Sequence, residues 1–188
     1  MYHFRVAVVL VSGGSSERLA ADYVRAAFEF GRQAARRGWT LRTGGGRGTS
    51  IMGAATDGAL SGGGRAEGVI LRKFWAVRHR RLRSLRVCGT FARRKAGLFR
   101  GADAAVFFPG GYGTLDELGD ILALKQNGFT DVPVLLVNVR GYFDPLVAWF
   151  RRAGREGFLY GGRPFEVVGT PLAAARRLAS LLARPAGR

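Results

Sequence analysis

Short apolar runs alternate with amphipathic stretches along the whole chain. Residues 4–11 form a continuous apolar run, rich in β-branched side chains, that ends in small and polar residues. This pattern is typical of a buried parallel strand that feeds a turn. An apolar stripe at helical spacing follows and stops at Gly38, which predicts a helix that Ser15 or Ser16 can cap.

The same alternation continues to the end of the chain. Further strands are predicted over residues 39–43, 68–71, 85–88, 104–108, 132–139 and 165–168. Helices are predicted over residues 50–60, 91–99, from 114 to about 127, from 145 to about 153, and 171–182. Strands that alternate with helices imply a mostly parallel sheet of about seven strands with helices on both faces. The fold class is therefore α/β, a doubly wound sheet of the Rossmann-like kind, as one domain over residues 1–183 with a frayed tail at 184–188.

Glycine-rich turns follow three of the predicted strands, at Gly13-Gly14, Gly44-Gly45-Gly46 and Gly110-Gly111-Tyr112-Gly113. The carboxyl ends of parallel strands meet at one edge of a sheet, so these turns are expected to gather there. Backbone N–H groups and helix N-termini at such an edge suit a phosphate group. The sequence therefore predicts an anion site at that edge.

The segment Pro109–Glu117 contains the densest set of candidate functional residues. Its glycines let the backbone approach an anion closely, and Thr114 can donate a hydroxyl group. A purely structural interpretation is also open, because Thr114 and Glu117 have the spacing of a helix capping box.

The chain carries a net charge of +17, and no acidic residue lies between Glu67 and Asp103. Such a field favours either a small phosphorylated substrate or a nucleic acid. A compositional bias is the third interpretation, since all but three of the 30 basic residues are arginines. We expect at most weak, non-specific nucleic-acid binding, because the sequence shows no recognisable reading helix or aromatic stacking platform.

Other classes of function have little support. No apolar run approaches the roughly 20 residues that a membrane span needs, and no charged leader precedes the first strand, so a cytoplasmic location is expected. Cys88 is expected to be a buried, inert thiol, and His3 and His79 lack companions at metal-ligand spacing. No metal site is predicted.

The motif Pro109–Glu117 resembles the signature of the LONELY GUY family, the cytokinin riboside 5′-monophosphate phosphoribohydrolases formerly described as lysine decarboxylases. The resemblance spans nearly the whole chain. It includes Gly44-Gly45-Gly46, Met52-Gly53-Ala54, Gly68-Val69-Ile70, Arg94-Lys95 and the segment 138–146, in the family's order and approximate spacing.

The resemblance implies hydrolysis of the N-glycosidic bond of a purine nucleoside 5′-monophosphate, releasing a free base and ribose 5-phosphate. It implies that Arg94 and Glu117 are catalytic and that the protein is a homodimer without a cofactor. The implied substrate-binding residues are Lys95, Gly110, Gly111, Tyr112, Gly113, Thr114, Gly45, Gly46 and Met52. Proteins of similar fold carry molybdenum cofactor, so a non-catalytic carrier is the alternative. Without the resemblance, Arg94 would be assigned to a solvated helix face beside Arg93.

The sequence departs from the family pattern at two places. Arg93 stands where family members commonly have a glutamate beside the catalytic arginine. Residues 71–78, which follow Ile70, contain no acidic residue that could recognise the substrate in the family's manner. These arginine replacements point to a more anionic or larger ligand.

Overall fold

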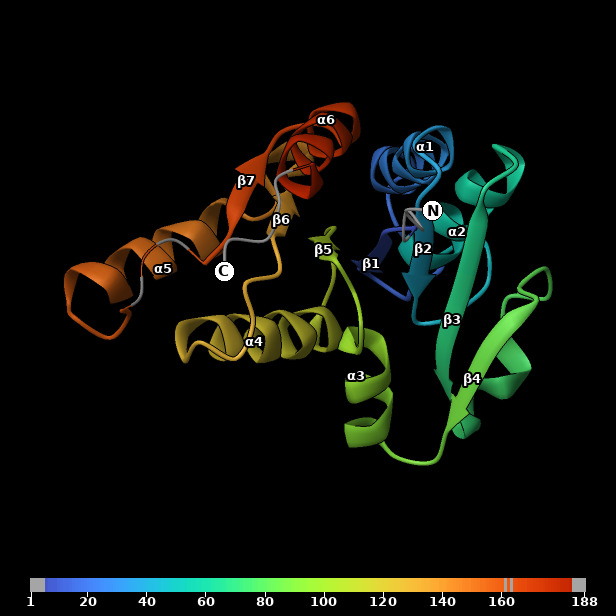
Figure 1. Ribbon diagram of the computed structural model, residues 1–188, viewed down its shortest axis with the longest axis horizontal. Helices are drawn as coiled ribbons and strands as arrows, with labels where there is room; N and C mark the ends of the chain where they lie inside the picture. Colours follow the sequence, from blue (N-terminus) through green and yellow to red (C-terminus); the bar gives the residue numbers. More distant parts are fainter. Residues whose placement is uncertain (1–5, 161, 163, 184–188) are drawn as a thin grey trace, which may run out of the picture.

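Seven strands form one all-parallel sheet in the computed structural model, which describes residues 6–160, 162 and 164–183 (Figure 1). The start of the first predicted strand and the tail 184–188 lie outside the described residues. The strands are β1 (Val8–Ser12), β2 (Thr40–Thr43), β3 (Arg65–Leu71), β4 (Ser84–Cys88), β5 (Ala104–Phe107), β6 (Val134–Val137) and β7 (Glu166–Val168).

The strand order is β4-β3-β2-β1-β5-β6-β7. Strands β2, β3 and β4 therefore follow one another on one side of β1, and β5, β6 and β7 follow one another on its other side. Each neighbouring pair is parallel. The direction of building reverses between β1 and β5, which is where ligands bind in open α/β sheets. The predicted doubly wound sheet is confirmed.

Helices cover both faces of the sheet, and each face has its own apolar core (Figure 1). On one face lie α1 (Ala21–Arg36), α2 (Ile51–Ser61) and α6 (Pro171–Leu182), where Phe30 packs edge-to-face on Phe108. On the other lie α3 (Phe91–Phe99), α4 (Tyr112–Gln126) and α5 (Asp144–Arg155). The central strands have side chains buried on both faces, which explains their continuous apolar runs.

Two helix starts differ from the predictions. Helix α1 begins at Ala21 without a side-chain cap, and the hydroxyl of Ser16 instead accepts from the backbone N–H of Arg18 in the preceding turn. Helix α4 begins at Tyr112 with Gly111 at its N-cap, so Thr114 and Glu117 lie inside the helix. The proposed capping by Ser15 or Ser16 and the Thr114–Glu117 capping box are therefore wrong. With Gly111 at the N-cap, the α4 helix starts three residues earlier than it would with Thr114 as the cap.

The start of β3 and the two short 3-10 helices also differ from the predictions. Strand β3 begins at Arg65, and residues Arg72–Val77 form a 3-10 helix, η1, that the hydrophobic pattern did not indicate. A second short 3-10 helix, η2, spans Val139–Gly141. None of the helices in the described part of the chain is long and apolar enough to cross a membrane.

Candidate active site

A buried carboxylate lies where the order of strands reverses. Glu117 projects from α4, and one of its carboxylate oxygens accepts a hydrogen bond from Arg94 Nη1 at 2.6 Å. The other oxygen accepts from the hydroxyl of Ser12, at the end of β1, also at 2.6 Å. The side chains of Glu117 and Arg94 are only 6% and 14% exposed. Three elements thus hold one charged pair out of bulk water.

The first turn of α3 sets the direction of Arg94. The hydroxyl of Thr90 caps this helix by accepting from the backbone N–H of Arg93. Consecutive helical residues point about 100° apart, and here Arg94 turns toward the sheet while Arg93 stays exposed. The solvated-face interpretation therefore does not hold for Arg94, because its guanidinium group pairs with Glu117.

Two glycine-rich turns meet beside this pair, as predicted. The backbone N–H of Gly14 donates to the carbonyl of Pro109 at 2.9 Å. A side chain on Gly110 would overlap Thr114, which is buried beneath the turn. The phenol of Tyr142 donates to the carbonyl of Gly110 at 2.8 Å. Contacts from three segments thus fix the backbone that leads into α4.

The N-terminal turn of α4 faces open space. Side chains added at Gly111 or Gly113 would meet nothing within 4 Å, and Tyr112 is 92% exposed. The first N–H groups of a helix have no partners within the helix and carry a partial positive charge. This turn therefore offers backbone donors to an anion close to Glu117.

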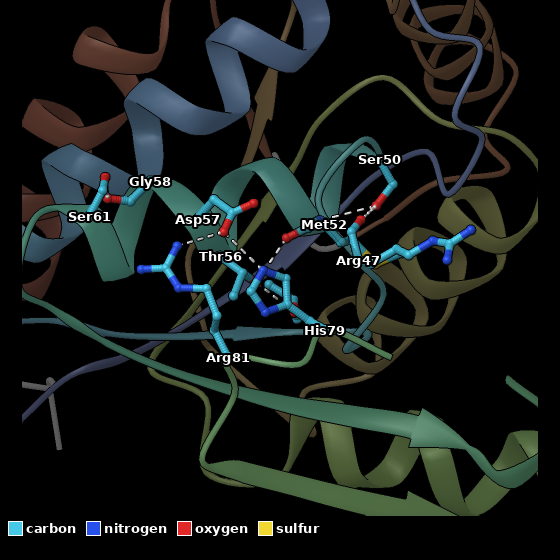
Figure 2. A network of polar contacts seen from close by, with 11 residues as sticks. Arg47, Ser50, Met52, Thr56, Asp57, Gly58, Ser61, His79 and Arg81 are labelled. Atoms are coloured by element: carbon cyan, nitrogen blue, oxygen red, sulfur yellow. Dashed lines mark hydrogen bonds and ion pairs between the residues drawn. The ribbon is translucent and has the colours of Figure 1, made fainter. Parts of the chain in front are cut away.

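The third glycine-rich turn is held by contacts that the sequence did not reveal, and Figure 2 shows the side chains of His79, Asp57 and Arg81 that take part in this network. The backbone N–H of His79 donates to the carbonyl of Gly45 at 2.8 Å, and Gly46 forms an isolated bridge with Arg78. His79 is buried, and its Nε2 lies 3.1 Å from Asp57 Oδ1 on α2. The same carboxylate oxygen accepts a hydrogen bond from Arg81. This network fastens the Gly44–Gly46 turn between α2 and η1. The lone histidine gave no signal of such a role.

Met52 and Lys95 have different surroundings. The sulfur of buried Met52 and the guanidinium group of Arg94 both lie against Gly44, so Met52 borders the site. Lys95 Nζ instead forms ion pairs with Asp116 and Asp120 at 2.9 and 2.8 Å, and the hydrogen bond to Asp120, followed by that to Asp116, raises the pKa of Lys95. Contact between Lys95 and a substrate remains a prediction.

Two further sequence predictions concern metal sites and the lone thiol. Within residues 6–160, 162 and 164–183, no three His, Cys, Asp or Glu side chains gather closely enough to hold a metal ion. Cys88 is buried and unpaired, as expected.

Gly44 supplies a direct test of the Arg94 geometry. A Cβ atom at this position would lie 2.5 Å from Arg94 Nη2 and 2.7 Å from the sulfur of Met52. Both are ends of flexible side chains, so Gly44→Ala should fold normally but displace the guanidinium group. We expect a loss of about 10- to 100-fold in activity with a small change in melting temperature.

The matched control is Gly154→Ala on the exposed face of α5, where the added methyl group meets nothing within 4 Å. It should leave activity unchanged. Equal activity of the two variants would remove Arg94 from the reaction.

A family model described as "Possible lysine decarboxylase" matches residues 52–163. Among curated proteins, the chain is 36% identical over 168 residues to the probable cytokinin riboside 5′-monophosphate phosphoribohydrolase LOGL5 of Oryza sativa subsp. japonica, covering 88% of this chain and 68% of that protein. It is 32% identical over 167 residues to the cytokinin riboside 5′-monophosphate phosphoribohydrolase LOG1 of Arabidopsis thaliana, covering 88% of this chain and 78% of that protein. The chain belongs to this family of phosphoribohydrolase-like proteins.

Solved structures show the same fold. The molybdenum cofactor binding protein of Rippkaea orientalis superposes with a TM-score of 0.75 at 22% identity, covering 96% of this chain and 99% of that one. A molybdenum cofactor carrier protein of Chlamydomonas reinhardtii superposes with a TM-score of 0.75 at 25% identity, covering 96% and 100%. The first likeness supports the fold alone.

Proposed function

We propose that the protein hydrolyses the N-glycosidic bond of a purine nucleoside 5′-monophosphate and releases the free base and ribose 5-phosphate. The observation that supports this proposal most directly is the buried carboxylate of Glu117, which accepts a hydrogen bond from Arg94 on one oxygen and from Ser12 on the other. A cytokinin-type nucleotide is the first candidate substrate, because the curated relatives are named for cytokinin riboside 5′-monophosphate.

The chemistry of this bond suits a fixed negative charge. When the bond from the ribose carbon to the base nitrogen breaks, its electron pair leaves with the base and positive charge develops on the ribose. A preorganised carboxylate in a water-poor site stabilises that charge strongly. Glu117 is also placed to orient the attacking water and to accept its proton, while the departing base nitrogen gains a proton.

Arg94 has two proposed roles. Its guanidinium group holds the carboxylate of Glu117 in position through the 2.6 Å contact. The planar fork carries further donors that can bind a ribose hydroxyl or the phosphate. Arg94 thus links the carboxylate to the substrate.

The phosphate is proposed to lie at the N-terminal turn of α4. Gly111 and Gly113 have no side chains that would block access to the backbone of this turn, and the side chain of Tyr112 is exposed. Gly110 and Thr114 support this turn from below. Contact between the substrate and the Gly45-Gly46 turn, which His79 holds through the carbonyl of Gly45, is part of the same proposal. A helix N-terminus binds phosphate through its free N–H groups and dipole.

The experiment is a panel of nucleoside monophosphates assayed for release of free base. The panel includes adenosine, guanosine, inosine and isoprenylated adenosine 5′-monophosphates, each paired with its unphosphorylated nucleoside as a matched control. We expect turnover of at least one monophosphate and little turnover of its nucleoside. Binding without release of base from any compound would contradict hydrolysis.

The alternative is a non-catalytic carrier of nucleotide or molybdenum cofactor. Its support is the likeness to the solved molybdenum cofactor carrier protein of Chlamydomonas reinhardtii, at 25% identity. A carrier needs the anion-binding turns but has no use for a buried carboxylate between Arg94 and Ser12. Tight cofactor binding combined with failure of the whole panel would favour the carrier.

We further propose that the protein is a homodimer with its active sites near the subunit interface. Phe91 and Tyr112 expose 62% and 92% of their surfaces, and Leu115 exposes 44%. These side chains project from α3 and α4, the two helices that carry Arg94 and Glu117. Light scattering after size exclusion measures the stoichiometry, and a monomer at micromolar concentration would refute a stable dimer.

The positive field is expected to speed capture of the phosphorylated substrate. Arg80 and Arg83 are exposed and form no ion pair in the described part of the chain, whereas Arg81 is bonded to Asp57. Reversing the charge at Arg80 and Arg83 should lower kcat/KM at low salt and leave kcat unchanged. The effect should fade toward physiological salt, because the Debye length falls from about 30 Å at 0.01 M to about 8 Å.

The dependence on salt concentration also separates this proposal from nucleic-acid binding. Helix η1 exposes two aromatic side chains, Phe74 and Trp75, which the sequence did not indicate as a platform, and Arg78 stacks on Trp75. A nucleic-acid binder would show a steep log–log loss of oligonucleotide affinity with salt. Submicromolar oligonucleotide binding at physiological salt, without activity on any nucleotide, would overturn the enzyme proposal.

A further inference from the structure

A second basic site lies on the other side of α3 from Glu117. A pocket of about 390 Å³ opens between the edge strand β4 and helix α3. Four arginines line it, Arg72 from η1, Arg86 from β4, and Arg93 and Arg100 from α3 and its C-cap. Every residue of its lining falls between Arg72 and Arg100, within the interval that contains no Asp or Glu.

The geometry of α3 separates this pocket from the candidate active site. Arg93, Ala96, Gly97 and Arg100 follow the spacing i, i+3, i+4, i+7 and therefore share one face of the helix. Arg94 lies on a different face, against Gly44 and Glu117. Arg86 lies beside Gly97, where an added Cβ atom would be in ordinary contact with Arg86 Nη1 at 3.7 Å.

The four guanidinium groups of the pocket are not neutralised by any residue in the part of the chain that the structure describes. None of them forms a side-chain hydrogen bond or an ion pair with another part of the described chain. The carbonyl groups of Leu98 and Arg100 at the end of α3 are occupied by Arg42, which also pairs with Glu67. Arginine stays charged at any physiological pH, so four like charges face one small volume. A bound anion would relieve their mutual repulsion.

We propose that this pocket binds a polyphosphate group of two or three linked phosphates, as a nucleoside diphosphate or triphosphate carries. Several adjacent negative charges match four guanidinium groups, whereas a single phosphate supplies at most two. The volume falls within the range of small-molecule sites, about 300 to 1,000 Å³. A second copy of the chain is a poor occupant, because a symmetric contact would bring the same arginines together. The ligand is distinct from the proposed substrate, whose phosphate lies at α4.

Direct binding of inorganic tripolyphosphate tests the proposal. Calorimetric titration at physiological ionic strength compares the parent protein with Arg86→Ala/Arg100→Ala, which removes two charges from the pocket. The matched control, Arg80→Ala/Arg83→Ala, removes two exposed charges from the same basic interval outside the pocket lining. We expect affinity to fall by about tenfold or more in the pocket variant and by less than about twofold in the control.

Cys88 provides a second and local readout, because it is the sole cysteine of the chain and lines the pocket. Alkylation of this buried thiol by iodoacetamide should be slow in the parent protein, and tripolyphosphate should slow it further there but not in Arg86→Ala/Arg100→Ala. Arg94→Ala, which should weaken nucleotide binding at the active site, should bind tripolyphosphate like the parent, and this keeps the test independent of the proposed hydrolysis.

Three results would overturn the proposal. Equal losses of affinity in the pocket variant and the control would assign binding to the general surface field. Loss of binding in Arg94→Ala would place the anion in the active site. Submicromolar binding of a short oligonucleotide through Arg86 and Arg100, without binding of tripolyphosphate, would assign the pocket to a nucleic-acid backbone.

Discussion

Glu117→Gln is expected to abolish release of the base, with a loss of about 10³-fold or more in kcat. The amide keeps the shape of the carboxylate but not its negative charge. Its oxygen can still accept from Arg94, and its NH₂ group can donate to the hydroxyl of Ser12, which serves as donor or acceptor. The fold and the affinity for nucleotide should therefore remain close to those of the parent. Single-turnover base release and nucleotide titration measure the two quantities separately.

The matched control for Glu117→Gln is Asp120→Asn. Asp120 belongs to the same helix and is half exposed at 41%, but it pairs with Lys95, which retains Asp116 as a partner. This substitution changes the charge of α4 equally and should leave the reaction intact. Turnover of Glu117→Gln within a few-fold of the parent would exclude Glu117 from the chemistry.

Arg94→Ala is expected to damage both catalysis and stability. It leaves the buried carboxylate of Glu117 without its cationic partner, and breaking a buried pair in this way costs about 3 to 5 kcal/mol. It also removes donors that the proposal assigns to the substrate, so kcat/KM should fall by about 10³-fold, with weaker nucleotide binding. Thermal unfolding and steady-state kinetics on the same preparation measure both effects.

A double variant separates the structural from the catalytic role of Arg94. Arg94→Ala/Glu117→Gln removes both charges, so it should regain much of the melting temperature that Arg94→Ala loses while remaining inactive. Arg94→Lys preserves the charge but not the planar fork, and it should recover stability better than activity. Arg94→Ala with a lowered melting temperature but normal kcat/KM would assign this residue to stability alone.

The local pattern of the sequence determined the class of fold and most of the elements. Strands buried on both faces require continuous apolar runs, and β1, β5 and β6 were found close to the predicted ranges for this reason. Helix ends were less predictable, because a side-chain cap competes with other local turns. Ser16 bonds to the turn before α1, and Gly111 lets α4 begin ahead of Thr114.

The candidate site was only partly contained in the sequence. Parallel topology brings the carboxyl ends of the strands to one edge, so the meeting of the glycine-rich turns near Gly14 and Gly110 followed from the order of elements alone. The family motif supplied Glu117 and Arg94. Sequence spacing gave no signal for Ser12, which lies 105 residues from its partner Glu117.

Only the tertiary structure decided which side chains share the surroundings of Glu117. Arg93 and Arg94 are adjacent residues of the same type. The rotation of about 100° per residue along α3 places Arg93 at the basic pocket and Arg94 against the buried carboxylate of Glu117. The attachment of His79 to Gly45 and the position of β4 at the sheet edge likewise depend on strand order. Sequence by itself determined the alternation of elements because burial of apolar side chains is periodic and local. Pairing of charged side chains is not local, because it depends on which elements the sheet brings together.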